Sequence, residues 1–342
     1  MKDIRDYSLL AHNTFGIDAK CKRFLEYSSV EEAQQIVAGL TAADQPLLIL
    51  GGGSNLLLTG DYEGTVIHSA IKGIEVLDNE KLHSSDSVFL SCGSGEVFDD
   101  VVAYAVEHGY HGAENLSIIP GEVGASAVQN IGAYGVEAKD IIYKVEAVEI
   151  ATGKVVVFDN QDCQYSYRQS RFKHEWKDKY LVTHVIYCLS KHFVPDLDYG
   201  NIRTSLAAKK IGNPTAQQLR DVIIEIRNAK LPDPKVQGNA GSFFMNPIVQ
   251  KAKYEELAAL YPGMPHYTID AEHEKIPAGW MIDQCGWKGQ SLGRAGVHDK
   301  QALVLVNRGG ATGGEIVNLC ETIRKDVKQK FGIDIHPEVN VK

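Results

Sequence analysis

The stretch of residues 119–135 limits most strongly what this chain can fold into. Glycine and other small residues dominate it, and Gln129 and Asn130 are embedded among them. Because glycine in a strand interior weakens the strand, this stretch is not an ordinary core strand. Such a backbone can lie flat against a large planar ligand, with its amide groups available for the polar edge of that ligand. The alternative is a glycine-rich loop without a special role.

A second glycine-rich segment follows a short apolar run. Residues 46–50 are expected to form a buried strand, which ends at Gly51-Gly52-Gly53-Ser54-Asn55. Three glycines let the backbone turn tightly and approach a ligand closely. Successive N–H groups can then form a nest for a pyrophosphate, to which Ser54 and Asn55 would add hydrogen bonds. The segment matches neither the GxGxxG fingerprint nor a Walker A sequence, and an ordinary strand-to-loop turn is the alternative.

The rest of the chain alternates between helix and strand signals. Capping residues and apolar spacing predict helices near residues 28–40, 96–108, 215–228, 253–260, 279–285 and 315–331. Apolar runs at 145–150 and 155–158 flank Thr152-Gly153 and predict a hairpin. The alternating tail, 333–341, is expected to form an edge or bent strand because Pro337 interrupts it. Prolines that follow the 215–228 helix mark a domain boundary near residue 229.

Composition narrows the class of protein. With 342 residues the chain exceeds the usual size of one hydrophobic core, so two or three domains are expected. Its apolar runs fall far short of the roughly 20 residues that span a bilayer, and residues 1–6 lack an apolar signal core. We therefore expect a cytoplasmic protein without a membrane partner. Six scattered cysteines without a CxxC pair argue against a zinc site, and no metal is expected.

The net charge of −9 bears on the choice of ligand. An acidic chain is poorly suited to a long nucleic-acid backbone, whose affinity comes from neutralising many phosphates, so no nucleic-acid partner is expected. A small phosphorylated ligand needs only a few cations and some backbone N–H groups, and it remains compatible with this charge.

Three polar residues are candidates for catalysis, each with a plainer alternative. Arg168 lies among aromatic residues in 165–171, where an arginine is more often solvated or stacked than catalytic. Ser242 lies in the glycine-rich segment 230–247 without a neighbouring histidine or a GxSxG elbow, which argues against a nucleophilic hydrolase. It could give a proton to a carbanion, or it could be a turn serine that bonds its own backbone. Glu338 by itself reads as a solvent-facing carboxylate.

Taken in order, the segments 51–57, 119–137, Tyr167-Arg168, 230–247 and Pro337-Glu338 resemble the UDP-N-acetylenolpyruvoylglucosamine reductase family, also called UDP-N-acetylmuramate dehydrogenases, over nearly the whole chain. The resemblance implies an α+β protein with an FAD-binding fold of the vanillyl-alcohol-oxidase type. Two α/β subdomains, 1–72 and 73–228, would bind FAD, and a C-terminal α+β domain, 229–342, would bind the substrate. The tail of that last domain would return to the active site.

The resemblance also implies a function. The chain would be a monomeric, cytoplasmic flavoenzyme with non-covalent FAD and NADPH as co-substrate. It would reduce the enolpyruvyl ether of its UDP-sugar substrate, UDP-N-acetylenolpyruvoylglucosamine, to UDP-N-acetylmuramate in peptidoglycan precursor synthesis. Arg168 would stabilise the developing enolate, Ser242 would protonate the carbon next to the substrate carboxylate, and Glu338 would support the enol intermediate.

Binding residues are carried over from the family residue by residue. FAD would be held by Gly51, Gly52, Gly53, Ser54, Asn55, Leu56, Pro120, Gly121, Gly124, Ala125, Ser126, Gln129, Asn130, Gly132, Tyr134 and Gly135. The UDP-sugar would be held, mainly at its diphosphate, by Tyr167, Tyr199, Lys230, Asn246 and Gln301. Tyr199 and the insert after Asn246 resemble the longer of the family's two types, in which a tyrosine loop closes over the substrate.

Two other interpretations stay open. Another FAD-dependent dehydrogenase of the same superfamily could act on an alcohol or a sugar lactone. The set Arg168, Ser242 and Glu338 argues against this, because saturating a carbon–carbon double bond needs a proton donor. A nucleotide-binding regulator without catalysis is the second alternative, and the presence of all three candidate groups argues against it.

Overall fold

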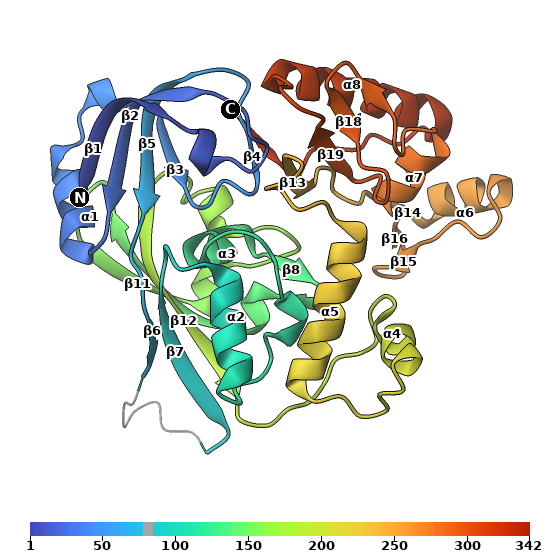
Figure 1. The fold of residues 1–342 in the computed structure, drawn as a ribbon, viewed down its shortest axis with the longest axis horizontal. Helices are drawn as coiled ribbons and strands as arrows, with labels where there is room; N and C mark the ends of the chain where they lie inside the picture. The colour runs from blue at the N-terminus through green and yellow to red at the C-terminus, as the bar shows by residue number, and fades with distance from the viewer. Residues whose placement is uncertain (78–84) are drawn as a thin grey trace. The chain divides into compact units, whose positions relative to one another are not determined.

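The computed structural model describes residues 1–77 and 85–342, and these divide into two compact units (Figure 1). Unit 1 consists of Met1–Tyr7, Cys21–Gly52 and Glu63–Ala229. Unit 2 consists of Ser8–Lys20, Gly53–Tyr62 and Lys230–Lys342. Two short N-terminal segments therefore belong to unit 2, although the sequence around them belongs to unit 1. The partition into three domains expected from the sequence stays a prediction.

The first sheet of unit 1 has four strands in the order β1-β2-β5-β3. These are β1 (Lys2–Ser8), β2 (Lys20–Tyr27), β5 (Tyr62–Ser69) and β3 (Leu47–Leu50), with β3 parallel to β5. Helix α1 (Val30–Gly39) follows β2, and Ser29 caps it by accepting a hydrogen bond from Glu32 N. Apolar residues of β2, α1, β3 and β5 share one core cluster, so the predicted strand and helix here are confirmed.

The second sheet of unit 1 has five strands in the order β11-β10-β12-β7-β6. They are β6 (Ile74–Val76), β7 (Ser87–Gly93), β10 (Ile142–Glu149), β11 (Val155–Asp159) and β12 (Tyr180–Ser190), and all neighbours are antiparallel. Strands β10 and β11 form the predicted hairpin. Helices α2 (Phe98–Glu107) and α3 (Val123–Gln129) bury their apolar residues against this sheet in one core cluster.

Unit 1 also contains a short hairpin and two further α-helices. A short hairpin joins β8 (Gly132–Ala133) to β9 (Val136–Glu137), and α4 (Ile202–Ala208) packs with α5 (Ala216–Lys230) around a small apolar cluster. Helix α5 lies beside α2 (Figure 1), where Arg220 donates to both oxygens of Asp99 at 2.7 and 3.0 Å. Thr215 and Gln218 form the expected reciprocal cap of α5.

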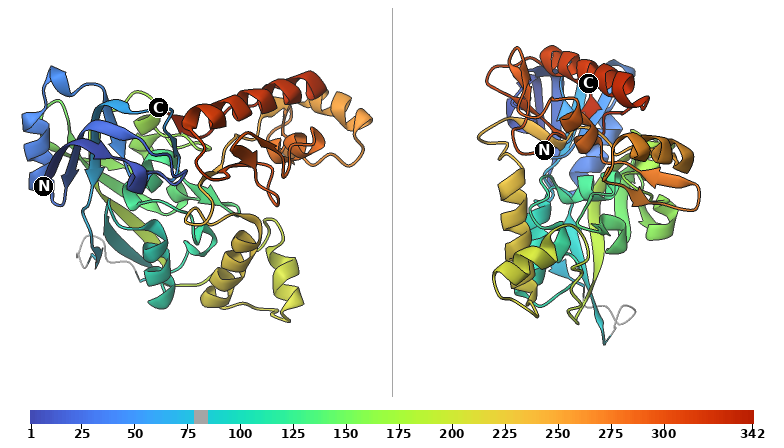
Figure 2. Two further views of the ribbon diagram at one scale, coloured as in Figure 1. Left: turned by 45° about the horizontal axis from the view of Figure 1, so that its top comes forward. Right: turned by 90° about the vertical axis from the view of Figure 1, so that its right-hand side faces the viewer.

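Unit 2 is built on a four-stranded sheet in the order β13-β19-β18-β17. These strands are β13 (Asn239–Ser242), β19 (Val304–Asn307), β18 (Ala295–Val297) and β17 (Ser291–Leu292). The long helix α8 (Gly313–Phe331), red in Figure 2, packs on this sheet and begins with the predicted capping box of Thr312 and Glu315. Helix α7 (Ala278–Gln284) packs against α8.

Smaller elements of unit 2 flank this sheet. A three-stranded sheet of β14 (Ile248–Gln250), β16 (His273–Lys275) and β15 (Tyr267–Thr268) accompanies helix α6 (Lys251–Leu260). Strand β20 (Asn340–Val341), at the end of the chain, pairs in parallel with β4 (Leu56–Leu57). None of the helices in the described ranges combines the length and apolar character that a membrane-spanning helix needs.

Two elements differ from the sequence-based expectation. Residues 123–129 form helix α3, in which small residues hide the usual apolar spacing. Its glycine, Gly124, packs closely on the neighbouring chain, since a Cβ there would lie 3.0 Å from Ser94 Cβ. The tail does not form one continuous strand. It pairs at a bridge between Pro337 and Phe244 and again in β20, because the proline has no N–H to continue the ladder.

Candidate active site

Within unit 1, the two glycine-rich segments meet. Gly51 and Gly52 follow β3, and a Cβ on Gly51 would lie 3.2 Å from Ala125 Cβ and 3.3 Å from Glu122 Oε2. A Cβ on Gly52 would lie 3.5 Å from Gly121 Cα. The absence of these Cβ atoms lets the backbones of the two segments approach each other closely. The structure therefore brings together residues of the two stretches that the sequence predicted to hold the FAD.

The third glycine of this loop belongs to unit 2. Gly53 has φ +65°, and a Cβ there would lie 1.9 Å from the carbonyl oxygen of His12, so a larger residue does not fit. Thr14 N donates to Gly53 O at 3.2 Å, and Thr14 Oγ1 donates to Asn239 O at 2.6 Å. The loop is thus fastened to the strand that carries Ser242.

The carboxyl end of the same loop is joined to the tail of the chain. Asn55 Nδ2 donates to Glu338 O at 3.4 Å, and Asn340 donates to Asn55 O from its backbone N at 3.2 Å and from its Nδ2 at 3.1 Å. Leu56 is buried in β4, directly beside Asn340 of β20. Residues predicted to bind the cofactor and a residue predicted to be catalytic, Glu338, are therefore part of one hydrogen-bonded assembly in unit 2.

Two polar residues of the 119–135 stretch, Ser126 and Asn130, form hydrogen bonds with other parts of unit 1. The buried hydroxyl of Ser126 lies 2.7 Å from Tyr187 Oη and donates to Val123 O. Asn130 is fully buried in the left-handed conformation with φ 45°; its Nδ2 donates to Glu137 Oε2 at 2.9 Å and to Ser166 O at 2.8 Å. These bonds hold the backbone of this stretch in place, and the predicted role of both residues at the FAD stays a prediction.

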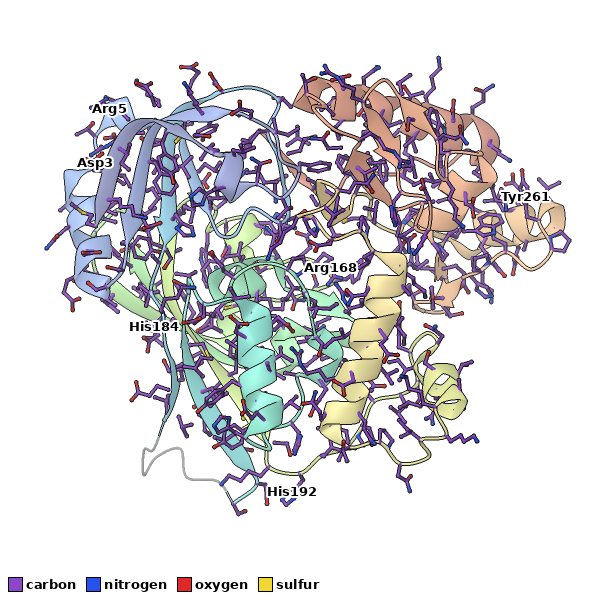
Figure 3. The ribbon with its side chains drawn as sticks, viewed as in Figure 1. Asp3, Arg5, Arg168, His184, His192 and Tyr261 are labelled. Atoms are coloured by element: carbon purple, nitrogen blue, oxygen red, sulfur yellow. The ribbon has the colours of Figure 1, made fainter. Side chains whose placement is uncertain are left out.

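Arg168, labelled in Figure 3, lies against this same stretch. Its guanidinium donates to Asn130 O at 3.3 Å and to Gly132 O, and it lies 5.3 Å from the centre of the Tyr167 ring. A Cβ on Gly132 would lie 2.8 Å from Arg168 Nη1, so the glycine makes room for the arginine. Arg168 itself has φ 57°, a left-handed conformation that is unusual for a non-glycine residue.

The loop that carries Tyr199 is fastened to the end of the same stretch. The rings of Tyr134 and Tyr199 meet edge to face with centroids 6.3 Å apart. Asn115 Nδ2 donates to Tyr134 O at 2.9 Å and to Asp196 O at 3.1 Å, which ties the two segments together. Tyr199 remains 41% exposed, so its ring is accessible to a ligand.

In unit 2, Ser242 and Glu338 come from distant parts of the chain to neighbouring positions. A register shift in β13 between Asn239 and Ser242, with Gly241 at φ +67°, leaves the serine exposed opposite Val304. Glu338 N then donates to the carbonyl of Phe243, the residue after Ser242, at 2.8 Å. The backbone thus positions both predicted catalytic residues of this unit.

Three of the residues predicted to bind the UDP-sugar, Lys230, Asn246 and Gln301, are also in unit 2. Asn246 Oδ1 accepts a hydrogen bond from Ala278 N at 2.9 Å, and Gln301 Oε1 accepts one from Leu303 N at 3.3 Å. Lys230 is exposed at the end of α5. Both amides therefore have their oxygens engaged with backbone, and the NH₂ group is the donor that each side chain offers.

Sequence reasoning missed one group of side chains in unit 1. His68, on β5, lies with Nδ1 3.1 Å from Glu26 Oε2 and with Nε2 3.2 Å from Glu122 Oε1. Burial disfavours the charged imidazole, but the hydrogen bonds and charges of Glu122 and Glu26 outweigh it and raise the pKa of His68. The only local signal was a glutamate in an otherwise small and apolar glycine-rich stretch.

Family models and curated relatives both match this chain, and the relatives match nearly all of it. Residues 22–159 match the FAD binding domain, and residues 233–342 match the UDP-N-acetylenolpyruvoylglucosamine reductase C-terminal domain. The UDP-N-acetylenolpyruvoylglucosamine reductase of Bacteroides fragilis is 57% identical over 98% of this chain and 98% of that protein. The protein of the same name from Porphyromonas gingivalis is 47% identical, again over 98% of both.

The fold is also similar to a solved structure. The crystal structure of UDP-N-acetylenolpyruvylglucosamine reductase from Thermus caldophilus superposes with a TM-score of 0.66 at 21% identity, covering 99% of this chain and 98% of that one. The predicted fold class is confirmed: an FAD-binding fold of the vanillyl-alcohol-oxidase type followed by a C-terminal α+β domain.

Proposed function

The chain belongs to the UDP-N-acetylenolpyruvoylglucosamine reductase family, and from this premise we propose how its residues divide the work of the reaction. It is an FAD-dependent oxidoreductase that uses NADPH to reduce UDP-N-acetylenolpyruvoylglucosamine to UDP-N-acetylmuramate. This reaction belongs to peptidoglycan synthesis and so to cell-wall biogenesis, cell shape and cell division. When bound, FAD would supply the hydride-transfer chemistry between NADPH and the enolpyruvyl double bond.

The residues present fit the cofactor. Gly51 and Gly52 let their backbone approach Gly121 and Ala125 of the second predicted FAD segment, and Gly53 holds a turn that a larger residue does not fit. We assign the FAD pyrophosphate to N–H groups of this loop, where glycine permits close backbone approach. Asn130 and Ser126 hold the 119–135 backbone in position for the rest of the flavin.

The protonation step falls to Ser242. When the terminal carbon of the enolpyruvyl group gains a hydride, electron density moves onto the adjacent carbon and the carboxylate. The Ser242 Oγ–H bond breaks and a new C–H bond forms on that adjacent carbon, which completes the addition of one hydride and one proton. Its exposed position in the bulge of β13 supports this role. An ordinary serine is a weak acid, so the strong basicity of the carbanion drives the transfer.

Charge stabilisation falls to Arg168 and Glu338. A fixed guanidinium favours the negative charge that accumulates at the substrate carboxylate, an effect that is largest in a site from which water is excluded. Glu338 would hydrogen-bond the enol form of the same carboxyl group. The observation that carries this assignment is the bond from Glu338 N to Phe243 O, which supports a shared task for Glu338 and Ser242.

We assign substrate binding to five other residues. Lys230 offers a cation to the diphosphate, and Asn246 and Gln301 offer amide donors whose oxygens are already engaged. Tyr199, whose ring is partly exposed, would cover the bound sugar nucleotide, with Tyr167 beside Arg168. We further propose a cytoplasmic monomer without membrane or nucleic-acid partners, since NADPH and the UDP-sugar are cytoplasmic nucleotides and the chain has a net charge of −9.

A steady-state assay tests the function. The purified protein should oxidise NADPH only when UDP-N-acetylenolpyruvoylglucosamine is present, and mass spectrometry should find a product heavier by one hydride and one proton. UDP-N-acetylglucosamine, which lacks the enolpyruvyl group, is the control and should cause no NADPH oxidation. Equal oxidation with both sugars would contradict the proposed substrate.

A further inference from the structure

A buried histidine in unit 1 bridges two carboxylates. His68 is 8% exposed, and its two ring nitrogens face Glu26 on β2 and Glu122 in the segment before α3, at 3.1 and 3.2 Å. A second cation, Lys2 Nζ on β1, lies 2.6 Å from Glu26 Oε1. Two carboxylates can share one imidazole at both nitrogens only if the ring donates twice, which requires the protonated form.

The bridge ends at the proposed phosphate loop. Glu122 Oε2 would lie 3.3 Å from a Cβ on Gly51, and Glu122 Oε1 would lie 3.8 Å from a Cβ on Gly52. A carboxylate in this place would repel the negatively charged pyrophosphate of FAD unless its charge is compensated. Because Lys2 pairs with Glu26, compensation at Glu122 depends on His68.

Charged groups on three neighbouring segments face His68 or its partners. Strand β2 contributes Glu26, β1 contributes Lys2, and the segment before α3 contributes Glu122. Strand β3 contributes only leucine and isoleucine. The phenol of Tyr27 is also near Glu122, but burial raises its pKa, so it stays neutral across the physiological range. With His68 protonated, the charges of this group cancel; with His68 neutral, one negative charge remains.

We propose that His68 is a positioning residue for the cofactor: its imidazolium holds Glu122 and cancels its charge beside the Gly51–Gly52 loop, so that FAD binds most tightly when His68 is protonated. The proposal rests on the assignment of the FAD pyrophosphate to this loop. It predicts a cofactor affinity that falls as the pH rises through the titration of His68, and a reciprocal uptake of a proton when FAD binds.

The test measures release of FAD from the holoenzyme. The protein is diluted in series at constant ionic strength between about pH 6 and pH 9, where histidine titrates, and the fluorescence of free FAD gives the dissociation constant. For the wild type, we expect the dissociation constant to rise about tenfold across this range, the scale of one uncompensated nearby charge.

Three variants separate charge from structure. His68→Gln should bind FAD about tenfold more weakly at low pH, with little further change as the pH rises. Glu122→Gln should keep tight binding at high pH, and the double variant His68→Gln with Glu122→Gln should regain the affinity lost by His68→Gln alone. His192→Gln is the matched control, because His192 forms an exposed pair with Asp86 at 3.1 Å, and it should behave as wild type.

Each outcome decides between the assignments. A dissociation constant that stays constant with pH in the wild type, or a double variant that binds no better than His68→Gln, would overturn the role of His68. A purified protein that holds no FAD at any pH would instead contradict the proposed function. Restoration by the double variant excludes a merely structural role, since it removes both partners of the bridge.

Discussion

The two units hold their proposed functional groups by different means. In unit 1, buried polar side chains shape the backbone: Asn130 makes hydrogen bonds through both ends of its amide, Ser126 pairs with Tyr187, and His68 bridges two carboxylates. In unit 2, backbone hydrogen bonds place Ser242 and Glu338. Substitution of these buried polar side chains should therefore cost structure in unit 1, whereas substitution of Ser242 or Glu338 should cost chemistry in unit 2.

The largest effect is expected in unit 2, at Ser242. Ser242→Ala should slow reoxidation of the reduced flavin by substrate on the order of 10²–10⁴-fold, the usual scale for loss of a general acid. Flavin reduction by NADPH and the melting temperature should be unchanged, because backbone bonds hold this strand. Anaerobic stopped-flow measures the two half-reactions separately.

Ser291→Ala, at an exposed serine of β17, is the control and should keep both half-reactions. A Ser242→Ala enzyme that no longer accepts electrons from NADPH would show that the serine has a different role. A Ser242→Ala enzyme with a lower melting temperature would break the contrast between the two units.

The next effect is expected at Gly53, a glycine of the proposed FAD loop whose Cβ space is closed by backbone. Gly53→Ala places a Cβ 1.9 Å from the His12 carbonyl oxygen at φ +65°, so it should destabilise the fold by about 3 kcal/mol and lower the bound FAD. Thermal melting and the flavin absorbance of the purified protein measure both. Gly60→Ala, which meets nothing within 4 Å, should change neither; equal losses in the two variants would contradict the assignment.

A smaller effect is expected at the amide network of unit 1. Asn130→Ala removes a fully buried amide and leaves its partners unsatisfied, which should cost about 2 kcal/mol of unfolding free energy. Chemical denaturation provides the value. The exposed Asn228 of α5 serves as control, and Asn228→Ala should stay within about 0.5 kcal/mol of wild type. A loss at Asn130 no larger than at Asn228 would remove the difference between the units.

The smallest effect is a pH dependence of stability carried by unit 1. The pKa of His68 is raised in the folded protein, against the effect of burial, by Glu122 and Glu26. The stabilisation is therefore fully present below the pKa of the unfolded histidine and is lost as the pH rises through the folded pKa. The melting-temperature difference between wild type and His68→Gln should be larger near pH 6 than near pH 9. A difference that grows with pH would reverse the sign and contradict the bridge.

Local signals predicted most of the regular structure. Each of these signals spans only a few neighbouring residues. The cap at Thr215 predicted α5, the cap at Thr312 predicted α8, and the apolar spacing of 96–108 predicted α2. Helix α3 was missed because small residues fill its positions and only packing against the second sheet of unit 1 reveals its buried face. The tail was predicted as an edge or bent strand but pairs only in short pieces.

The site was predictable only where a family pattern exists. Ser242 and Glu338 were named from resemblance, whereas their proximity depends on long-range backbone pairing that no local pattern contains. His68 and Glu122 lie 54 positions apart, and neither belongs to a recognisable motif. The hydrogen bonds of Ser126 to Tyr187 and of Asn130 to Ser166 likewise join distant parts of the chain that no local pattern connects.

One anaerobic experiment tests the central claim most directly. The purified yellow protein is reduced with NADPH while its visible spectrum is recorded, and UDP-N-acetylenolpyruvoylglucosamine is then added. We predict bleaching by NADPH followed by recovery of the oxidised flavin spectrum on addition of the sugar nucleotide. Bleaching without recovery, or a colourless protein that cannot be reconstituted with FAD, would contradict the account.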